Sequence, residues 1–385
     1  MQKWWKAPAS VLLVASMVLA SFPAARAAAA AGPQPAPTRI TAPDDSSIAL
    51  PSTGQVIVKF RKPEAAASVM AVAAKGGQTR AQANPTRMVV KLPQAPAQAR
   101  AMIKALQALP GVVYVENDET MKALDVPNDP KFGDLWGLSR IKADQAWAAV
   151  GNNQATVTVA VVDTGVDVQH QDLAGNLLGG YNAITQTYDD TPDVVGHGTH
   201  VAGTIAGVYN NGLGITGVAG PANVKILPVK VLGDDGTGSF SDVAAGIEWA
   251  ADNGANVINL SLGGGYSQAV AEAVRYAADR GVVVVAAAGN EHANTAQLAP
   301  AGVPGAVTVS AVDENTEPAW FSNFGAEVEL AAPGTHILST VPGNGYDWKS
   351  GTSMATPHVA AVAALIKATH PEYTRSEVQG CLIAS

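Results

Sequence analysis

The sequence predicts an α/β fold: a doubly wound parallel sheet with helices on both faces, preceded by a small α+β domain. Strand and helix patterns alternate over the larger, C-terminal part of the chain, which is typical of parallel sheets covered by helices. Several of the expected strands there are continuous runs rich in Val, Ile and Ala, as in strands buried on both faces. Polar residues follow some of these strands at the end where functional groups gather in such folds.

Composition and charge limit the possible functions. The 385 residues are 47% hydrophobic and 15% charged, as in a globular protein, and leave room for two or more domains. Residues 1–123 hold 14 Lys and Arg against 6 Asp and Glu, whereas the remainder holds 10 against 26. A basic leader and an acidic body attract each other through their fields. The acidic body argues against nucleic acid as a partner.

The first 27 residues have the pattern of a signal peptide. Lys3 and Lys6 precede a short apolar run, residues 11–20, and the small residues around Arg26 suit a signal peptidase. The run is shorter than the roughly 20 residues of a membrane span, so we expect a secreted protein without a membrane anchor. Residues 28–53 are rich in Ala and Pro and are expected to form a linker.

Residues 54–122 are expected to form a small domain with no catalytic cluster. Alternating patterns predict strands over 55–60 and 87–92, and a further strand over 112–116. Helical spacing covers residues 97–108. A β-α-β-α-β order in so few residues predicts an α+β sandwich of the split βαβ type.

Residues 123–385 carry the strand and helix alternation that predicts the parallel sheet. The expected strands are 157–162, 224–231, 256–260, 282–287 and 307–311. The expected helices are 201–207, 241–253, 268–280 and 355–368.

An aspartate follows the first of these strands, in Val162-Asp163-Thr164-Gly165. A single Asp-Thr-Gly also fits half of an aspartic protease site, but that chemistry needs two carboxylates that share a proton, and no second motif is present. The other interpretation of Asp163 is a residue that caps a turn.

Two histidines lie three residues apart in Gly196-His197-Gly198-Thr199-His200. The glutamate of the zinc-binding His-Glu-x-x-His pattern is missing, which argues against zinc. We expect His197, at the glycine-flanked start of a helix, to be a base and His200 to be a packing residue.

Ser353 and Asn290 complete the set of candidates. Ser353 is expected in the first turn of a helix, where free N–H groups and the helix dipole favour an oxyanion. Asn290 follows strand 282–287, where its amide can donate to that oxyanion. An ordinary helix cap and a turn asparagine are the alternative interpretations.

Taken together, Asp163-Thr164-Gly165, the stretch 197–203 and Gly351-Thr352-Ser353-Met354-Ala355 resemble the three signatures of the subtilisin-like (subtilase) serine proteases, in that family's order. Asn128-Asp129-Pro130 and the run 284–290 are most similar to the thermitase branch. The small domain resembles the family's propeptide, which acts as an intramolecular chaperone and inhibitor.

The resemblance implies a serine endopeptidase made as a proenzyme that processes itself. Ser353 would attack the peptide carbonyl, and His197 would move the proton. Asp163 would hold His197, while Asn290 and the Ser353 N–H would bind the oxyanion.

The resemblance also implies where the substrate lies. The residues expected to bind it are Ser261, Leu262, Gly263 and Gly264, which would pair with the peptide as an added strand, and Ala288 and Gly289 opposite. The pocket before the scissile bond is expected to be open and apolar, with no carboxylate. We therefore expect broad specificity with an apolar preference, and a monomeric enzyme.

Structural calcium is a further implication of the resemblance. The stretch 209–215 resembles the family's calcium loop, and an Asn-Gly turn is the alternative interpretation. A second, weaker site is expected around Asp189, Asp190 and Asp193. Cys381 is the only cysteine, so the chain has no internal disulfide. The expected ligands of the first site are Asp129, Asp172 and Asn211 with the carbonyls of Tyr209, Leu213 and Ile215.

The end of the chain departs from the family pattern. Members usually continue for another strand and helix beyond the segment that resembles 371–382, so we expect a truncated C-terminus and uncovered apolar surface. The alternative function is a catalytically incompetent homologue that acts only as a binding or inhibitory protein.

Overall fold

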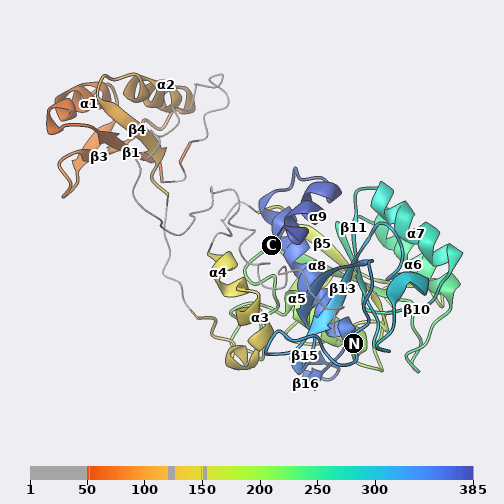
Figure 1. The fold of residues 1–385 in the computed structure, drawn as a ribbon. Coiled ribbons are helices and arrows are strands. Elements are labelled where there is room, and N and C mark those ends of the chain that lie inside the picture. Colours follow the sequence, from red (N-terminus) through yellow and green to blue (C-terminus); the bar gives the residue numbers. More distant parts are fainter. Residues whose placement is uncertain (1–49, 52, 120–125, 149, 151–153, 385) are drawn as a thin grey trace, which may run out of the picture. The chain divides into compact units, whose positions relative to one another are not determined.

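The computed structural model describes residues 50–51, 53–119, 126–148, 150 and 154–384. The expected signal peptide and the expected linker up to residue 49 lie outside these residues. The chain divides into two compact units, and along the sequence the division falls between Asp125 and Val126 (Figure 1). No helix in the described ranges is both long and apolar enough to cross a membrane.

Within the described residues, the smaller unit combines two α-helices with a four-stranded antiparallel sheet of order β2-β3-β1-β4. Alternate residues of β1, Val56, Val58 and Phe60, are buried in one core with the apolar stripe of α2. The predicted β-α-β-α-β order includes a helix at the place of α1, although the weak periodicity of α1 gave it no bounds, and it missed β2, whose four residues are all exposed. The elements are β1 (Gln55–Phe60), α1 (Ala66–Ala73), β2 (Gln78–Ala81), β3 (Arg87–Lys91), α2 (Pro96–Gln107) and β4 (Val112–Asn117).

The larger unit is built on an eight-stranded sheet of order β14-β13-β11-β9-β5-β8-β6-β7. Neighbouring strands are parallel except at the edge, where β6 and β7 form an antiparallel hairpin. The predicted α/β class is therefore confirmed. The strands are β5 (Val157–Asp163), β6 (Tyr181–Asn182), β7 (Thr187–Tyr188), β8 (Val224–Lys230), β9 (Val257–Leu260), β11 (Val283–Ala287), β13 (Ala306–Val312) and β14 (Val328–Pro333).

Helices cover both faces of this sheet, as predicted. Val159 and Val161 of β5 face a core shared with α5 and α8, whereas Ala160 and Val162 face a core shared with α6 and α7. This alternation explains why the strand is apolar at successive positions. The first core also includes α3 (Trp136–Arg140), α4 (Ala143–Trp147) and α9 (Arg375–Ile383) beside α5 (His197–Ala206) and α8 (Thr352–Thr369). The second includes α6 (Phe240–Asp252) and α7 (Gln268–Asp279).

Two short antiparallel pairs lie outside the main sheet. β10 (Gly264–Gly265) pairs with β12 (Leu298–Ala299), and β15 (Ile337–Val341) pairs with β16 (Gly345–Lys349). The first pair follows β9 and helps to form one wall of the cavity described below.

Helices α5 and α8 begin earlier than the apolar patterns predicted. They start at His197 and Thr352, because their first turns are polar or contain glycine and the apolar repeat begins only after them. At α5 the N-cap residue is Gly196, and the buried carboxylate of Asp193 accepts the backbone N–H groups of Gly196 and Thr199 at the start of the helix. Both early starts place a candidate catalytic residue in the first turn of a helix.

Candidate active site

Asp163 and His197 form a close pair between the end of β5 and the start of α5. His197 Nδ1 lies 2.7 Å from Asp163 Oδ1, and the aspartate is fully buried. Burial opposes protonation of the imidazole, but the charge of Asp163 and its hydrogen bond together outweigh burial, so the pKa of His197 is raised. With Nδ1–H donating to the carboxylate, Nε2 of the neutral ring is left as the base.

The neighbouring histidine has a different environment. His200 is fully buried, and its Nε2 lies 3.0 Å from the carbonyl oxygen of Ile337. Burial lowers the pKa of His200 to about 3, so it stays neutral. Its position is that of a packing residue.

Asp193 links the two segments that carry this pair. Its Oδ1 accepts the Thr164 hydroxyl and the Gly196 N–H, both at 2.8 Å. Its Oδ2 accepts the N–H and the hydroxyl of Thr199, at 2.8 and 2.6 Å. Both carboxylate oxygens are therefore occupied by protein donors, and a role of Asp193 in a second calcium site stays a prediction.

Ser353 is the second residue of α8 and faces the segment that follows β9. Its Oγ donates to the Ser261 carbonyl oxygen at 3.0 Å, and Ser261 Oγ donates to the Ser353 carbonyl oxygen at 2.8 Å. The structure has no hydrogen bond between Ser353 and His197 in the part of the chain it describes. Catalytic hydrogen bonds are often absent without a substrate and form only in the complex.

Asn290 is held by the residue that precedes the serine. Its Oδ1 accepts the N–H of Thr352 at 2.8 Å and the Thr352 hydroxyl at 3.0 Å. The same hydroxyl accepts the N–H of Gly289 at 3.0 Å. Because Thr352 N–H can only donate, the amide oxygen must face it, and Nδ2 is left to donate elsewhere.

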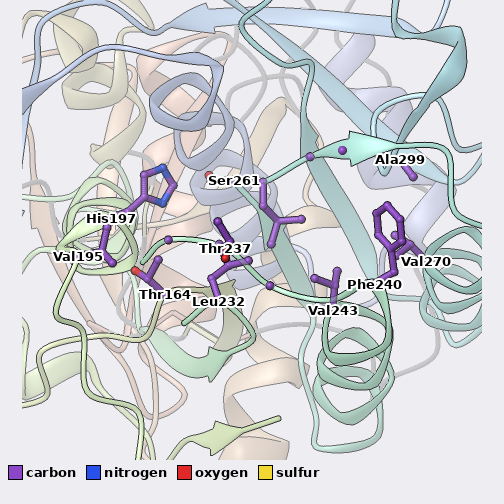
Figure 2. A pocket seen from close by; sticks show the side chains of 15 residues that line it. Thr164, Val195, His197, Leu232, Thr237, Phe240, Val243, Ser261, Val270 and Ala299 are labelled. Carbon is purple, nitrogen blue, oxygen red and sulfur yellow. The ribbon is translucent and has the colours of Figure 1, made fainter. Parts of the chain in front are cut away.

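A cavity of about 420 Å³ extends from His197 along the chain segments beside it. Figure 2 shows His197 at one end and Phe240, Val270 and Ala299 at the other, with Ser261 between them. Two backbone segments line it, 261–264 and 236–238, so all four residues expected on the substrate strand are present.

Two expected substrate residues, Ala288 and Gly289, are not among the residues that line this cavity. Ala288 is fully buried, and Gly289 lies next to the proposed oxyanion residue. A Cβ built on Gly289 would lie 2.8 Å from the Glu291 carboxylate. Glu291 does not line this cavity, and the residues that do include no Asp or Glu, so a pocket without a carboxylate stays a prediction.

Two buried carboxylates approach the loop between α5 and β8. Asp172 is fully buried and accepts Asn211 Nδ2, Ile215 N–H and the Tyr346 hydroxyl, at 2.8, 2.9 and 3.1 Å. Burial raises the pKa of Asp172, and the nearby charge of Asp129 raises it further. Burial also raises the pKa of Asp129. A bound cation would neutralise these two buried carboxylates, and carboxylate oxygens are ligands that calcium prefers.

The other expected calcium ligands belong to the same loop. The Tyr209 ring packs edge-on against Trp147, with 5.4 Å between the ring centroids. Leu213 is exposed, whereas Ile215 is buried. Asn211 presents its amide nitrogen to Asp172, so its oxygen faces the N–H of Leu213 instead. Within the described ranges, no group of three or more His, Cys, Asp or Glu residues is arranged to hold a metal. A site here would depend on the two aspartates and loop carbonyls.

Comparison with known proteins assigns both units. The model of the "Subtilase family" matches residues 154–385. This chain belongs to the subtilase family. The model of the "Fervidolysin N-terminal prodomain" matches residues 51–118 of this subtilase. The resemblance to subtilisin-like proteases with a propeptide is therefore confirmed, and the protein is a serine-type endopeptidase.

Named relatives agree with this assignment. The subtilase is 44% identical over 268 residues to the "Thermophilic serine proteinase" of Bacillus sp. (strain AK1), covering 69% of this chain and 66% of the relative. It is 48% identical over 243 residues to "Thermitase" of Thermoactinomyces vulgaris, covering 62% and 85%. A "cold adapted subtilisin-like serine proteinase" superposes with a TM-score of 0.57 at 38% identity, covering 65% of this chain and 90% of that structure.

Three residues with clear contacts at the site were missed from the sequence. Asp193 was assigned to a metal site, and neither Thr352 nor Asn323 was given a role. A signal existed only for Thr352, which stands inside the motif around Ser353. Nothing in the sequence distinguishes Asn323 from an ordinary turn asparagine.

Proposed function

We propose that this subtilase is a secreted, monomeric endopeptidase that hydrolyses peptide bonds with Ser353 as nucleophile, His197 as base and Asp163 as the residue that orients it. The observation that carries the proposal is the 2.7 Å bond between His197 and the fully buried Asp163. Ser353, in the first turn of α8, supports it because the helix terminus favours negative charge there.

The reaction follows from these positions. The Ser353 hydroxyl turns from the Ser261 carbonyl to Nε2 of His197, which takes its proton as Oγ attacks the substrate carbonyl. The oxyanion receives hydrogen bonds from Asn290 Nδ2 and the Ser353 N–H. The His197 imidazolium, stabilised by Asp163, then protonates the leaving amine. Water releases the acyl group by the same steps.

The substrate peptide is proposed to lie extended between segments 261–264 and 236–238. Glycines in both segments let a second backbone approach closely, as strand addition requires. The far end of the cavity is lined by apolar side chains, Phe240, Val270 and Ala299 (Figure 2). We therefore propose broad specificity with a preference for apolar residues.

A fluorophosphonate probe tests the nucleophile, because only an activated serine reacts with it. We expect the mature protein to be labelled at Ser353, and Ser353→Ala to remain unlabelled. Ser350→Ala is a matched control, since Ser350 is exposed and precedes the helix. Failure of the parent protein to react would favour the alternative of a noncatalytic binding protein.

We also propose export and self-processing from a proenzyme. Residues 1–27 serve as the signal peptide, and the unit that matches a prodomain is cut away between Asn117 and Val126. Ser353→Ala is then expected to accumulate uncut, whereas Ser350→Ala matures normally. Intact mass and N-terminal sequencing measure this. Normal cutting of purified Ser353→Ala would contradict self-processing.

Calcium is proposed as a structural ion at the loop between α5 and β8. Asp129 and Asp172 would hold it, together with the carbonyls of Tyr209, Leu213 and Ile215. The side-chain oxygen of Asn211 would join them once its amide turns from the orientation in which the nitrogen donates to Asp172. The ion would neutralise two carboxylates whose burial raises their pKa values.

A further inference from the structure

We propose that Asn323 is a positioning residue for Asn290 and holds the loop that carries it in the geometry the oxyanion needs. The inference rests on the proposed role of Asn290. Asn323 belongs to the segment between β13 and β14, and its side chain is fully buried.

The side chain of Asn323 is bonded to the loop on both sides of Asn290. Its Nδ2 donates to the Ala288 carbonyl at 2.9 Å and to Glu291 Oε2 at 2.8 Å. Its Oδ1 accepts the N–H groups of Glu291 and Ala293, at 3.0 and 2.8 Å. Two donors and two acceptor positions are the full capacity of an asparagine amide. All four are used on residues 288–293.

Glu291 connects the Asn323 side chain to the backbone of Asn290. Its Oε2, which accepts from Asn323, also accepts the Asn290 N–H at 2.9 Å. Thr352 holds the side-chain oxygen of Asn290 from the other direction. Asn290 is thus held through its backbone by Glu291 and Asn323, and through its side chain by Thr352. The donor Nδ2 is left with a fixed direction.

The residue at position 289 fits this arrangement. Gly289 has a φ of 102°, and a Cβ built on it would lie 2.2 Å from Asn323 Nδ2. Glycine is therefore required for Asn323 to approach the loop. The N–H of Asn323 also donates to the Gly289 carbonyl at 3.0 Å, which adds a backbone bond at the same point.

The direction of Asn290 Nδ2 matters because this donor stabilises negative charge that appears only in the transition state. A donor that must reorganise during the reaction contributes less, and a single oxyanion donor is worth about 10²–10³ in kcat. Loss of Asn323 should weaken that contribution without removing it. We expect kcat to fall about 10-fold to 100-fold, with KM changed less than about 2-fold.

Asn323→Asp is the test, made in the full chain and assayed after maturation with titrated active sites. The aspartate has the same shape and keeps the acceptor for the Glu291 and Ala293 N–H groups. It loses both donors and places a carboxylate oxygen against Glu291 Oε2. Ser322→Ala is the matched control: this neighbouring serine is also buried, and its Oγ accepts the Ala311 N–H and donates to the Asn323 backbone carbonyl, but it makes no bond to residues 288–293. The control is expected to keep its kcat even if its melting temperature falls.

A double-mutant cycle with Asn290→Ala separates positioning from general stability. If Asn323 acts through Asn290, Asn323→Asp lowers kcat in the parent but not in the Asn290→Ala background. Equal losses in both backgrounds would overturn the inference. If Asn290→Ala alone left kcat unchanged, the proposed oxyanion role would fail instead.

Glu291→Ala provides the same test should Asn323→Asp not fold, because it removes the single oxygen, Oε2, that accepts both the Asn323 amide and the Asn290 N–H. Glu291 is exposed, so its replacement tests the link to the Asn290 backbone at small cost to stability. We expect a smaller loss of kcat that also disappears in the Asn290→Ala background. An unchanged kcat for Glu291→Ala would contradict the proposed connection.

Discussion

Replacing Asp193 with asparagine should destabilise the larger unit strongly. The carboxylate accepts four hydrogen bonds, two on each oxygen, from Thr164, Gly196 and Thr199. An amide of the same shape has one oxygen, so two of these donors face an NH₂ group in either orientation. One of the two is a backbone N–H, which cannot turn away as a hydroxyl can.

Each hydrogen bond to a charged group contributes about 1.5–3 kcal/mol, so two lost bonds cost about 3–6 kcal/mol. That is a large part of the roughly 5–15 kcal/mol that stabilises a typical domain. The affected segments also carry Asp163 and His197, so activity should fall with stability.

Urea unfolding in the Ser353→Ala background measures the effect without autolysis. Asp190→Asn is the control, because Asp190 is exposed and its contact is a 3.4 Å bond from the Thr187 hydroxyl. We expect the control to change the free energy of unfolding by less than about 0.5 kcal/mol. If Asp193→Asn cost less than about 1 kcal/mol, the assigned role of the four bonds would be refuted.

Three further predictions follow from the site. Because Asp163 raises the pKa of His197, activity should be lost as pH falls through that raised value. Asp163→Asn should lower kcat about 10⁴-fold and move this acid limb of the pH profile to lower pH. An acid limb that stayed at the same pH would contradict the pairing of Asp163 with His197. Asp172→Ala should lower the melting temperature more in calcium than in excess chelator, because in chelator only the three protein hydrogen bonds to this carboxylate are lost, whereas equal losses under both conditions would argue against a ligand role. Met354 adjoins Ser353 and is only 2% exposed. Its sulfoxide would be a larger, polar group in a close-packed site, so oxidation of Met354 by peroxide should lower kcat more than it raises KM. Met354→Ala should resist peroxide at some loss of initial rate, and equal inactivation of both proteins would place the damage elsewhere.

The main features of the fold could be predicted because they depend on local patterns. β5 is apolar at successive positions since its neighbours alternate between two cores, and this leaves a clear mark in the sequence. The candidate residues Asp163, His197 and Ser353 could be found because each ends a strand or opens a helix. The start of α9 also had a signal, the capping box of Thr374 and Glu377, which a search for apolar periodicity does not detect.

The residues that support the site could not be predicted in the same way. Asp193 and Asn323 lie in connecting segments, where aspartate and asparagine are common in turns. Their roles depend on which donors and acceptors the packed chain brings to them, and Asn323 is bonded to residues 30 to 35 positions away. Such contacts are a property of tertiary structure and leave no periodic pattern.

The burial of α8 determines how the enzyme should lose activity on heating. Fifteen of its 18 residues are buried, and the helix packs in the core shared with α5 and the central strands. A segment of this kind opens only with the whole domain, so its amide hydrogens should be among the slowest to exchange with solvent. The proposed nucleophile, Ser353, therefore lies on a helix that unfolds only when the whole domain unfolds. Thermal inactivation should be a single cooperative event, with no earlier stage in which the enzyme is folded but the serine is displaced.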